Sequence, residues 1–120
     1  MKKTTLVLGA STNPSRYSYI AIKRLRNHDE PVKAIGLKEG IVQNIRIIKE
    51  KKHFEDIETV TLYLNPKRQE EYYDYIISLE PKRVIFNPGT ENPVFYKMLR
   101  DKNIEPVVAC TLVMLSTNQY

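Results

Sequence analysis

The seven prolines constrain the fold of this chain more than any other feature. Four follow asparagine and three follow glutamate, in the pairs Asn13-Pro14, Asn65-Pro66, Asn87-Pro88, Asn92-Pro93, Glu30-Pro31, Glu80-Pro81 and Glu105-Pro106. Each Asn-Pro pair follows a strand-like apolar run, and each Glu-Pro pair precedes one. Asparagine caps helix starts, and proline suits the first helical position while it stops a helix that precedes it. The two kinds of pair therefore mark opposite edges of a parallel sheet whose strands alternate with helices.

Short apolar runs and helical periodicity predict the elements between these prolines. The expected strands are Thr4–Leu8, Val32–Leu37, Thr59–Leu64, Arg83–Phe86 and Val107–Ala109. The expected helices are Pro14–Asn27, Pro66–Leu79 and Pro93–Lys102, with single helical turns at Phe54–Ile57 and Leu112–Leu115. Alternation at Ile45 and Ile47 predicts that Ile41–Lys49 forms one or two short strands or a hairpin arm.

Composition narrows the class of protein and the kinds of ligand. With 42% hydrophobic and 28% charged residues, the chain resembles an ordinary soluble globular domain, and no apolar run approaches the roughly 20 residues that span a bilayer. No apolar segment with a cleavage site follows Lys2 and Lys3, so we expect no signal peptide. The single cysteine, Cys110, permits no internal disulfide and favours a cytoplasmic location. The net charge of +5 suits an anionic ligand, although the basic residues are dispersed.

The stretch Leu6–Arg16 predicts an anion site. An apolar strand leads into Gly9, which permits a bend or a close backbone approach, and Asn13-Pro14 is expected to open the following helix. Such a turn leaves free backbone N–H groups at the positive end of a helix, which is a general means of holding phosphate. Ser11 and Asn13 are candidate side-chain donors, and Arg16 could add a charged contact.

Ligands of parallel sheets bind outside the carboxyl ends of the strands, which here is the Asn-Pro edge. This edge should gather the segments Gly9–Arg16, Gly36–Gly40, Asn65-Pro66, Asn87–Asn92 and Cys110-Thr111. The dinucleotide fingerprint is absent, because Ser11 and Pro14 occupy the places of its second and third glycines. A P-loop is also absent, since no Gly-Lys-Ser/Thr follows Gly9.

Three blocks of this edge resemble the small CoA-binding proteins, which are similar to the nucleotide-binding domain of succinyl-CoA synthetase. The blocks are Gly9-Ala10-Ser11 with Asn13-Pro14 and Arg16, then Phe86–Asn92, then Val107–Thr111. The resemblance implies an α/β Rossmann-like three-layer sandwich with a mainly parallel central sheet of about five or six strands, in one domain over residues 1–120. It also implies coenzyme A or an acyl-CoA as ligand, with the pyrophosphate at the Gly9–Arg16 turn.

One segment departs from the family. Many members carry a Val-Asn-Pro turn after the second strand, where this chain has Ile35-Gly36-Leu37-Lys38. This turn should face the adenine and ribose, so Lys38 becomes a candidate for a ribose phosphate. The residues that we assign to the cofactor are Gly9, Ala10, Ser11, Thr12, Asn13, Arg16, Gly36, Lys38, Asn65, Pro88, Gly89, Asn92 and Cys110.

The sequence favours a binding module without catalysis. Neither His28 nor His53 has metal-ligand spacing with another residue, and no nucleophile elbow is present. We expect a small-molecule partner of the CoA type, no membrane and no nucleic acid, and leave open a homodimer or a protein partner.

Three alternatives stay open. The first is an acyl-CoA or thiol-redox enzyme with Cys110 as nucleophile, for which Glu91 is a candidate base. The second is a domain for another nucleotide such as NAD, although Glu39 is the only nearby acid for its ribose and lies off the usual spacing. The third is a nucleic-acid or protein-binding domain that retains only the fold.

Overall fold

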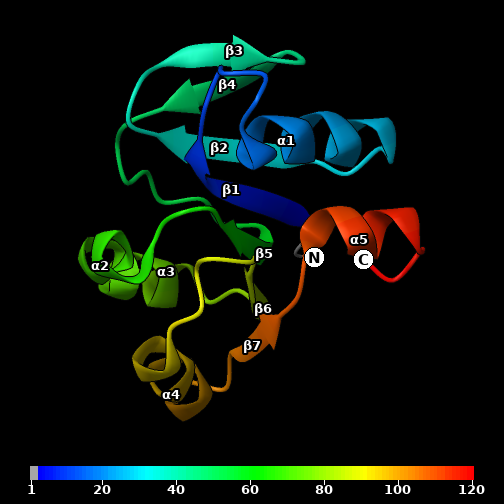
Figure 1. Cartoon of the computed structure of the whole chain (residues 1–120). Helices are drawn as coiled ribbons and strands as arrows, with labels where there is room; N and C mark the ends of the chain where they lie inside the picture. The colour runs from blue at the N-terminus through cyan, green and yellow to red at the C-terminus, as the bar shows by residue number, and fades with distance from the viewer. Residues whose placement is uncertain (1–2) are drawn as a thin grey trace.

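The computed structural model describes residues 3–120, and these residues form a seven-stranded sheet (Figure 1). The strands are β1 (Thr4–Ala10), β2 (Val32–Gly36), β3 (Gly40–Val42), β4 (Ile45–Ile48), β5 (Ile57–Leu62), β6 (Arg83–Phe86) and β7 (Glu105–Val108). Their spatial order is β3-β4-β2-β1-β5-β6-β7. Every neighbouring pair is parallel except the β3–β4 hairpin. The α/β Rossmann-like prediction is confirmed, with one more strand than the expected five or six because both arms of the hairpin join the sheet.

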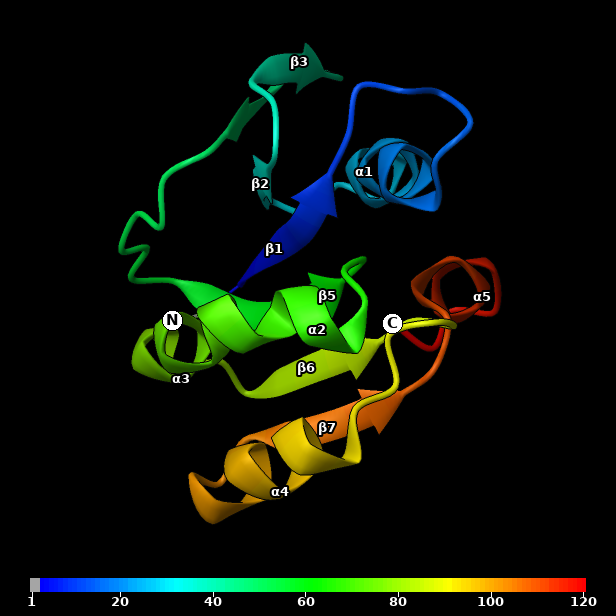
Figure 2. The same cartoon turned by 60° about the vertical axis from the view of Figure 1, so that its left-hand side comes forward.

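Helices cover both faces of this sheet (Figure 2). They are α1 (Tyr17–Asn27), α2 (Pro66–Gln69), the 3₁₀ turn η1 (Glu70–Tyr72), α3 (Tyr73–Leu79), α4 (Pro93–Asp101) and α5 (Thr111–Ser116). Leu6 and Leu8 of β1 pack in one apolar cluster with α3 and α4, whereas Val7 packs in a second cluster with α1 and α5. This division follows from the alternation of side chains along a strand. No helix within residues 3–120 is long and apolar enough to cross a membrane.

The first Asn-Pro pair does not begin a helix. We expected Asn13 as the N-cap, but α1 begins only at Tyr17. The Asn13 Oδ1 instead accepts hydrogen bonds from Ser15 N–H (3.0 Å) and Ser15 Oγ (2.8 Å), and Arg16 N–H donates to the Asn13 carbonyl (3.0 Å). Residues 13–16 therefore form a separate turn, because the asparagine side chain satisfies a turn before a helix can start.

Other predicted boundaries were also wrong. The segment Phe54–Ile57 is not helical, and β5 spans Ile57–Leu62 rather than Thr59–Leu64. The expected helix Pro66–Leu79 is interrupted by the η1 turn. The last strand begins at Glu105, so it contains Pro106. Proline is tolerated there because β7 is an edge strand and has one side without a pairing partner.

The strand order places the topological switch beside β1. From β1 the chain first builds β2 on one side, and later builds β5, β6 and β7 on the other. The carboxyl ends of β1 and β5 therefore meet at the point where such sheets bind ligands.

Candidate functional site

Gly9 joins the two loops at the switch point. Its φ is +95°, and a Cβ at this position would lie 2.9 Å from the carbonyl carbon and oxygen of Tyr63. Because a side chain is impossible at that distance, glycine allows the loop after β1 to lie directly against the loop after β5. The close backbone approach that the sequence predicted at Gly9 is therefore an approach to the backbone of Tyr63.

The loop that follows Gly9 uses its polar side chains to hold itself. Ser11 Oγ accepts the N–H of Asn13 (3.0 Å), and Asn13 in turn holds Ser15. These side chains fix the turn rather than project from it as free donors.

Helix α1 starts without a cap. Arg16 is the N-cap residue, its side chain makes no capping hydrogen bond, and no group in residues 3–120 accepts from the N–H of Tyr17 or Ser18. The Arg16 side chain is exposed at this positive helix end, where a cation is unfavourable unless an anion is present. Free N–H groups, the helix dipole and a guanidinium therefore combine at one place that can accept an anion.

Two further glycines let the end of β2 and the start of β3 lie against residues 10–12. A Cβ on Gly36 would lie 2.2 Å from the Ala10 carbonyl oxygen, and one on Gly40 would lie 2.4 Å from Thr12 Cγ2. Glycine is required at position 36, since a Cβ would overlap the backbone at the irregular end of β1. Lys38 lies exposed between these two contacts.

The buried side chain of Gln69 connects the loops that follow β5 and β6. Its Nε2 donates to the carbonyls of Leu64 and Thr90, both at 2.8 Å, and its Oε1 accepts from Asn92 Nδ2 at 2.9 Å. The side chain is fully buried. It therefore ties the loop after β5 to the loop after β6 with every polar atom satisfied.

The side chain of Asn87 makes a similar connection between the end of β5 and the start of α5. Its Nδ2 donates to Thr61 Oγ1 (2.7 Å) and the Leu62 carbonyl (2.9 Å), and its Oδ1 accepts the N–H of Thr111 (2.9 Å). The carboxyl ends of β5 and β6 are thus joined to the start of α5.

The turn at Pro88-Gly89 faces open space. Gly89 has a φ of +92°, and a Cβ there would meet no atom within 4 Å. Thr90 N–H donates to the Asn87 carbonyl (3.0 Å), as in a turn with proline and glycine at its centre. The Gly89 N–H donates to the carboxylate of Glu91 (2.9 Å), so this candidate base holds the turn.

Cys110 lies half-buried next to Tyr63 at the same edge. Burial raises the pKa of Tyr63 to about 12, the nearby hydroxyls of Thr61 and Thr111 oppose part of that rise, and the thiol of Cys110 adds to it. By the geometry of its contacts, the Tyr63 hydroxyl has no hydrogen-bond partner in residues 3–120. The nearby hydroxyls of Thr61 and Thr111 bond to each other at 2.8 Å.

Alkaline conditions should therefore weaken the fold through Tyr63. A phenol that ionises near 10 when unfolded and near 12 when folded gives full stability below pH 10, and that stability is lost as the pH rises toward 12. We expect Tyr63→Phe to match the wild type at pH 8 and to be about 1 kcal/mol more stable relative to it at pH 11. Urea unfolding at both pH values measures this, with the exposed Tyr17→Phe as control. Equal losses for all three proteins would contradict it.

The predicted cofactor residues all lie at the carboxyl edge of the sheet. Gly9, Ala10 and Gly36 are the last residues of β1 and β2. The others lie in the segments that follow the strands, namely Ser11, Thr12, Asn13, Arg16, Lys38, Asn65, Pro88, Gly89, Asn92 and Cys110. Asn65 and Asn92 cap α2 and α4 as expected, accepting from Arg68 N–H (2.9 Å) and Phe95 N–H (3.2 Å). Asn92 is buried, with its amide bonded to Gln69 and Tyr73, and so it faces the interior.

Sequence reasoning missed Gln69 and Tyr63. Neither carries a local signal, since Gln69 reads as an ordinary helical residue and Tyr63 as the end of a strand. Within residues 3–120, no group of three or more His, Cys, Asp or Glu side chains could hold a metal ion.

A family model described as a CoA binding domain matches residues 3–116. The chain belongs to this CoA-binding domain family. Three of the solved structures that share its fold span nearly all of the chain. The first, of a protein described as uncharacterized, is 48% identical with a TM-score of 0.96, and the match covers 100% of this chain and 99% of that one. A structure from Thermus thermophilus is 21% identical with a TM-score of 0.87 and coverage of 99% and 91%.

The third structure is a hypothetical protein from Pyrococcus horikoshii, 28% identical with a TM-score of 0.84 and coverage of 97% and 82%. No curated protein matches the chain with significant sequence similarity. Membership of the CoA-binding domain family supports CoA as the ligand class.

Proposed function

We propose that the edge between β1 and β5 binds coenzyme A or an acyl-CoA without catalysing a reaction on it, with the pyrophosphate at the Gly9–Arg16 turn. The observation that carries this proposal is the uncapped start of α1 beside an exposed Arg16, in a chain of the CoA-binding domain family. A pyrophosphate would accept the N–H groups of Tyr17 and Ser18 and pair with the guanidinium.

The remaining candidates take different parts in this proposal. Thr12 and Lys38 flank the turn on the β2 side, and in this proposal Lys38 would pair with a ribose phosphate. Asn65 and Gly89 follow β5 and β6, and the open space above Gly89 leaves room for the rest of the ligand. Gly9, Gly36 and Asn92 would support the site, because Gly9 and Gly36 lie against neighbouring backbone and Asn92 bonds to the buried Gln69.

Calorimetric titration with CoA, dephospho-CoA, ATP and NAD tests the ligand class. We expect CoA to bind with the highest affinity of the four. In the same titration Arg16→Ala should weaken CoA about 10- to 100-fold, since a hydrogen bond to a charged group contributes about 1.5–3 kcal/mol. Arg24→Ala, at the other end of α1, is the matched control and should leave the affinity unchanged. Equal affinities for Arg16→Ala and Arg24→Ala would rule out the charged contact.

Reaction of Cys110 with CoA disulfide separates a binding module from a thiol-redox enzyme, and Cys110→Ser is the control that cannot form the adduct. If the thiol only lies beside the ligand, the serine variant should bind CoA as the wild type does, and incubation with CoA disulfide should leave no adduct on the wild-type protein by mass spectrometry. A CoA adduct on Cys110 would instead support the thiol-redox alternative.

A further inference from the structure

The connection from β4 to β5 lacks a helix (Figure 2). Helices join β1 to β2, β5 to β6 and β6 to β7, but residues 49–56 cross to β5 as an irregular segment. This segment is held against the helical layer, since Lys51 Nζ donates to the Glu71 carbonyl (2.6 Å) and Tyr75 Oη donates to the Lys52 carbonyl. The face of β2 and β4 on that side of the sheet is therefore left without a helix.

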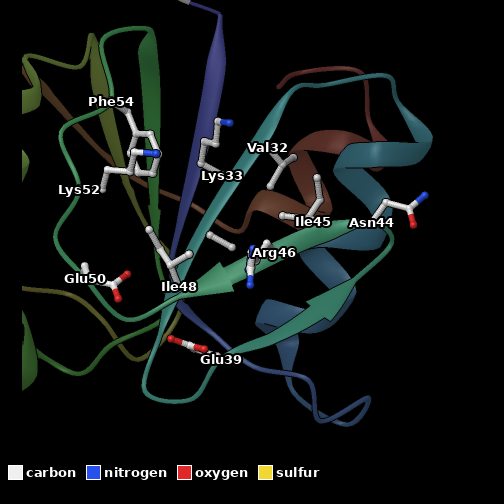
Figure 3. A pocket seen from close by; sticks show the side chains of 11 residues that line it. Val32, Lys33, Glu39, Asn44, Ile45, Arg46, Ile48, Glu50, Lys52 and Phe54 are labelled. Carbon is white, nitrogen blue, oxygen red and sulfur yellow. The ribbon is translucent and has the colours of Figure 1, made fainter.

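A groove of about 550 Å³ occupies this uncovered face (Figure 3). We call it the β2–β4 groove, and its lining includes Lys33, Glu39, Arg46, Ile48, Glu50, Lys52 and Phe54. Ile48 and Phe54 are half-buried and belong to the apolar cluster under α3 and α4. The pairing of Ala34 with Ile47 sets Lys33 level with Arg46, and both are exposed. The groove thus combines an apolar wall with cations.

Lys33 and Lys52 lie toward one end of the groove and Glu39 and Glu50 toward the other, with Arg46 between them (Figure 3). Glu39 and Glu50 come just after the carboxyl ends of β2 and β4. Lys33 lies toward the amino end, where its Nζ and that of Lys52 are 5.8 and 5.9 Å from the centre of the Phe54 ring. Within residues 3–120, none of these charged groups forms an ion pair.

We propose that the β2–β4 groove binds an amphipathic α-helix of a partner protein, in the direction of the missing crossover helix. A crossover helix begins at the carboxyl edge of a parallel sheet and returns antiparallel to the strands. In that direction its positive N-terminus meets Glu39 and Glu50, and its negative C-terminus meets Lys33 and the other cations. Strands β2 and β4 have five and four residues, and a helix of about 10 residues has a similar length.

The charge pattern selects this occupant over a polyanion. A nucleic acid carries negative charge along its whole length, and Glu39 and Glu50 would repel one end of it. The dipole of a bound helix is complementary to the charges at both ends of the groove. The apolar stripe of an amphipathic helix can at the same time pack on Ile48 and Phe54.

A phage-displayed library of helical peptides tests the proposal on the full chain. We expect selected peptides to carry an apolar i, i+3, i+4, i+7 stripe, to bind Lys33→Glu/Arg46→Glu at least about tenfold more weakly than the wild type, and to bind the control Lys23→Glu/Arg24→Glu normally. Amide spectra of each variant confirm that it is folded. Excess CoA should not displace the peptides, which separates this groove from the proposed cofactor site.

The direction of the bound peptide tests the proposal more strictly than its affinity does. A nitroxide on the peptide's N-terminus should broaden the amide signals of Glu39 and Glu50, and one on its C-terminus should broaden those of Lys33 and Asn44. Failure to select a peptide that depends on the groove cations, or the opposite broadening pattern, would overturn the proposal.

Discussion

Replacing Gly9 by alanine should destabilise this protein far more than the same change at Gly89. Both glycines have a φ above +90°, so both substitutions incur the left-handed backbone cost of about 1–2 kcal/mol. Only at Gly9 does the new Cβ also collide, because the Tyr63 carbonyl lies 2.9 Å away, whereas a Cβ on Gly89 meets nothing within 4 Å. Backbone cannot rotate away as a side chain can, so about 1–3 kcal/mol is added for the overlap.

We therefore expect Gly9→Ala to lower the free energy of unfolding by about 3 kcal/mol and Gly89→Ala by about 1 kcal/mol. For a domain of this size these values correspond to drops in Tm of roughly 12 °C and 4 °C. Thermal and urea unfolding of the two variants measures the difference. Similar losses for both would mean that the loops after β1 and β5 are not held in direct backbone contact. CoA affinity should fall with Gly9→Ala, since the Arg16 turn begins at this residue.

The sequence predicted those parts of the edge that depend on local chemistry. Asn65 and Asn92 cap their helices because a cap needs only an asparagine, a proline and the N–H groups three residues on. The same pattern failed at Asn13-Pro14, where the asparagine bonds to Ser15 and the helix starts later. A pattern of residue types does not specify which of two nearby N–H groups the side chain will hold.

The parts that the sequence did not predict depend on contacts between distant segments. The assignment of Gly36 to the cofactor stays a prediction, but nothing in the sequence indicated that this residue lies against the Ala10 carbonyl and an Ile47 methyl group. The Phe54–Ile57 turn was expected to be helical, but Phe54 instead joins the apolar cluster beneath α3 and α4. The residues that decide both outcomes lie far from them in sequence, and composition and periodicity carry no information about them.

Gln69 illustrates the same limit with the largest consequence for stability. Its three partners lie five to twenty-three residues away, and they belong to two different loops of the candidate site. Gln69→Ala should leave the buried carbonyls of Leu64 and Thr90 without their donor, and the Asn92 amide would keep only its bond to Tyr73. The change also removes volume from the interior. We expect a loss of about 3–5 kcal/mol, against less than about 0.5 kcal/mol for Gln119→Ala on the surface.

Gln69→Glu tests whether the amide acts as a donor. A carboxylate can still accept from Asn92, but when ionised it would face the Leu64 and Thr90 carbonyls with no proton to donate. Burial and the two carbonyl oxygens that face it should raise the pKa of the introduced carboxyl above its unfolded value. The neutral form is then the one that fits, so its stability is greatest at low pH and is lost as the pH rises through the folded pKa. Urea unfolding should accordingly place Gln69→Glu nearer the wild type at pH 4.5 than at pH 7. A gap that is the same at both pH values would show that Gln69 does not join these loops by donating to their carbonyls.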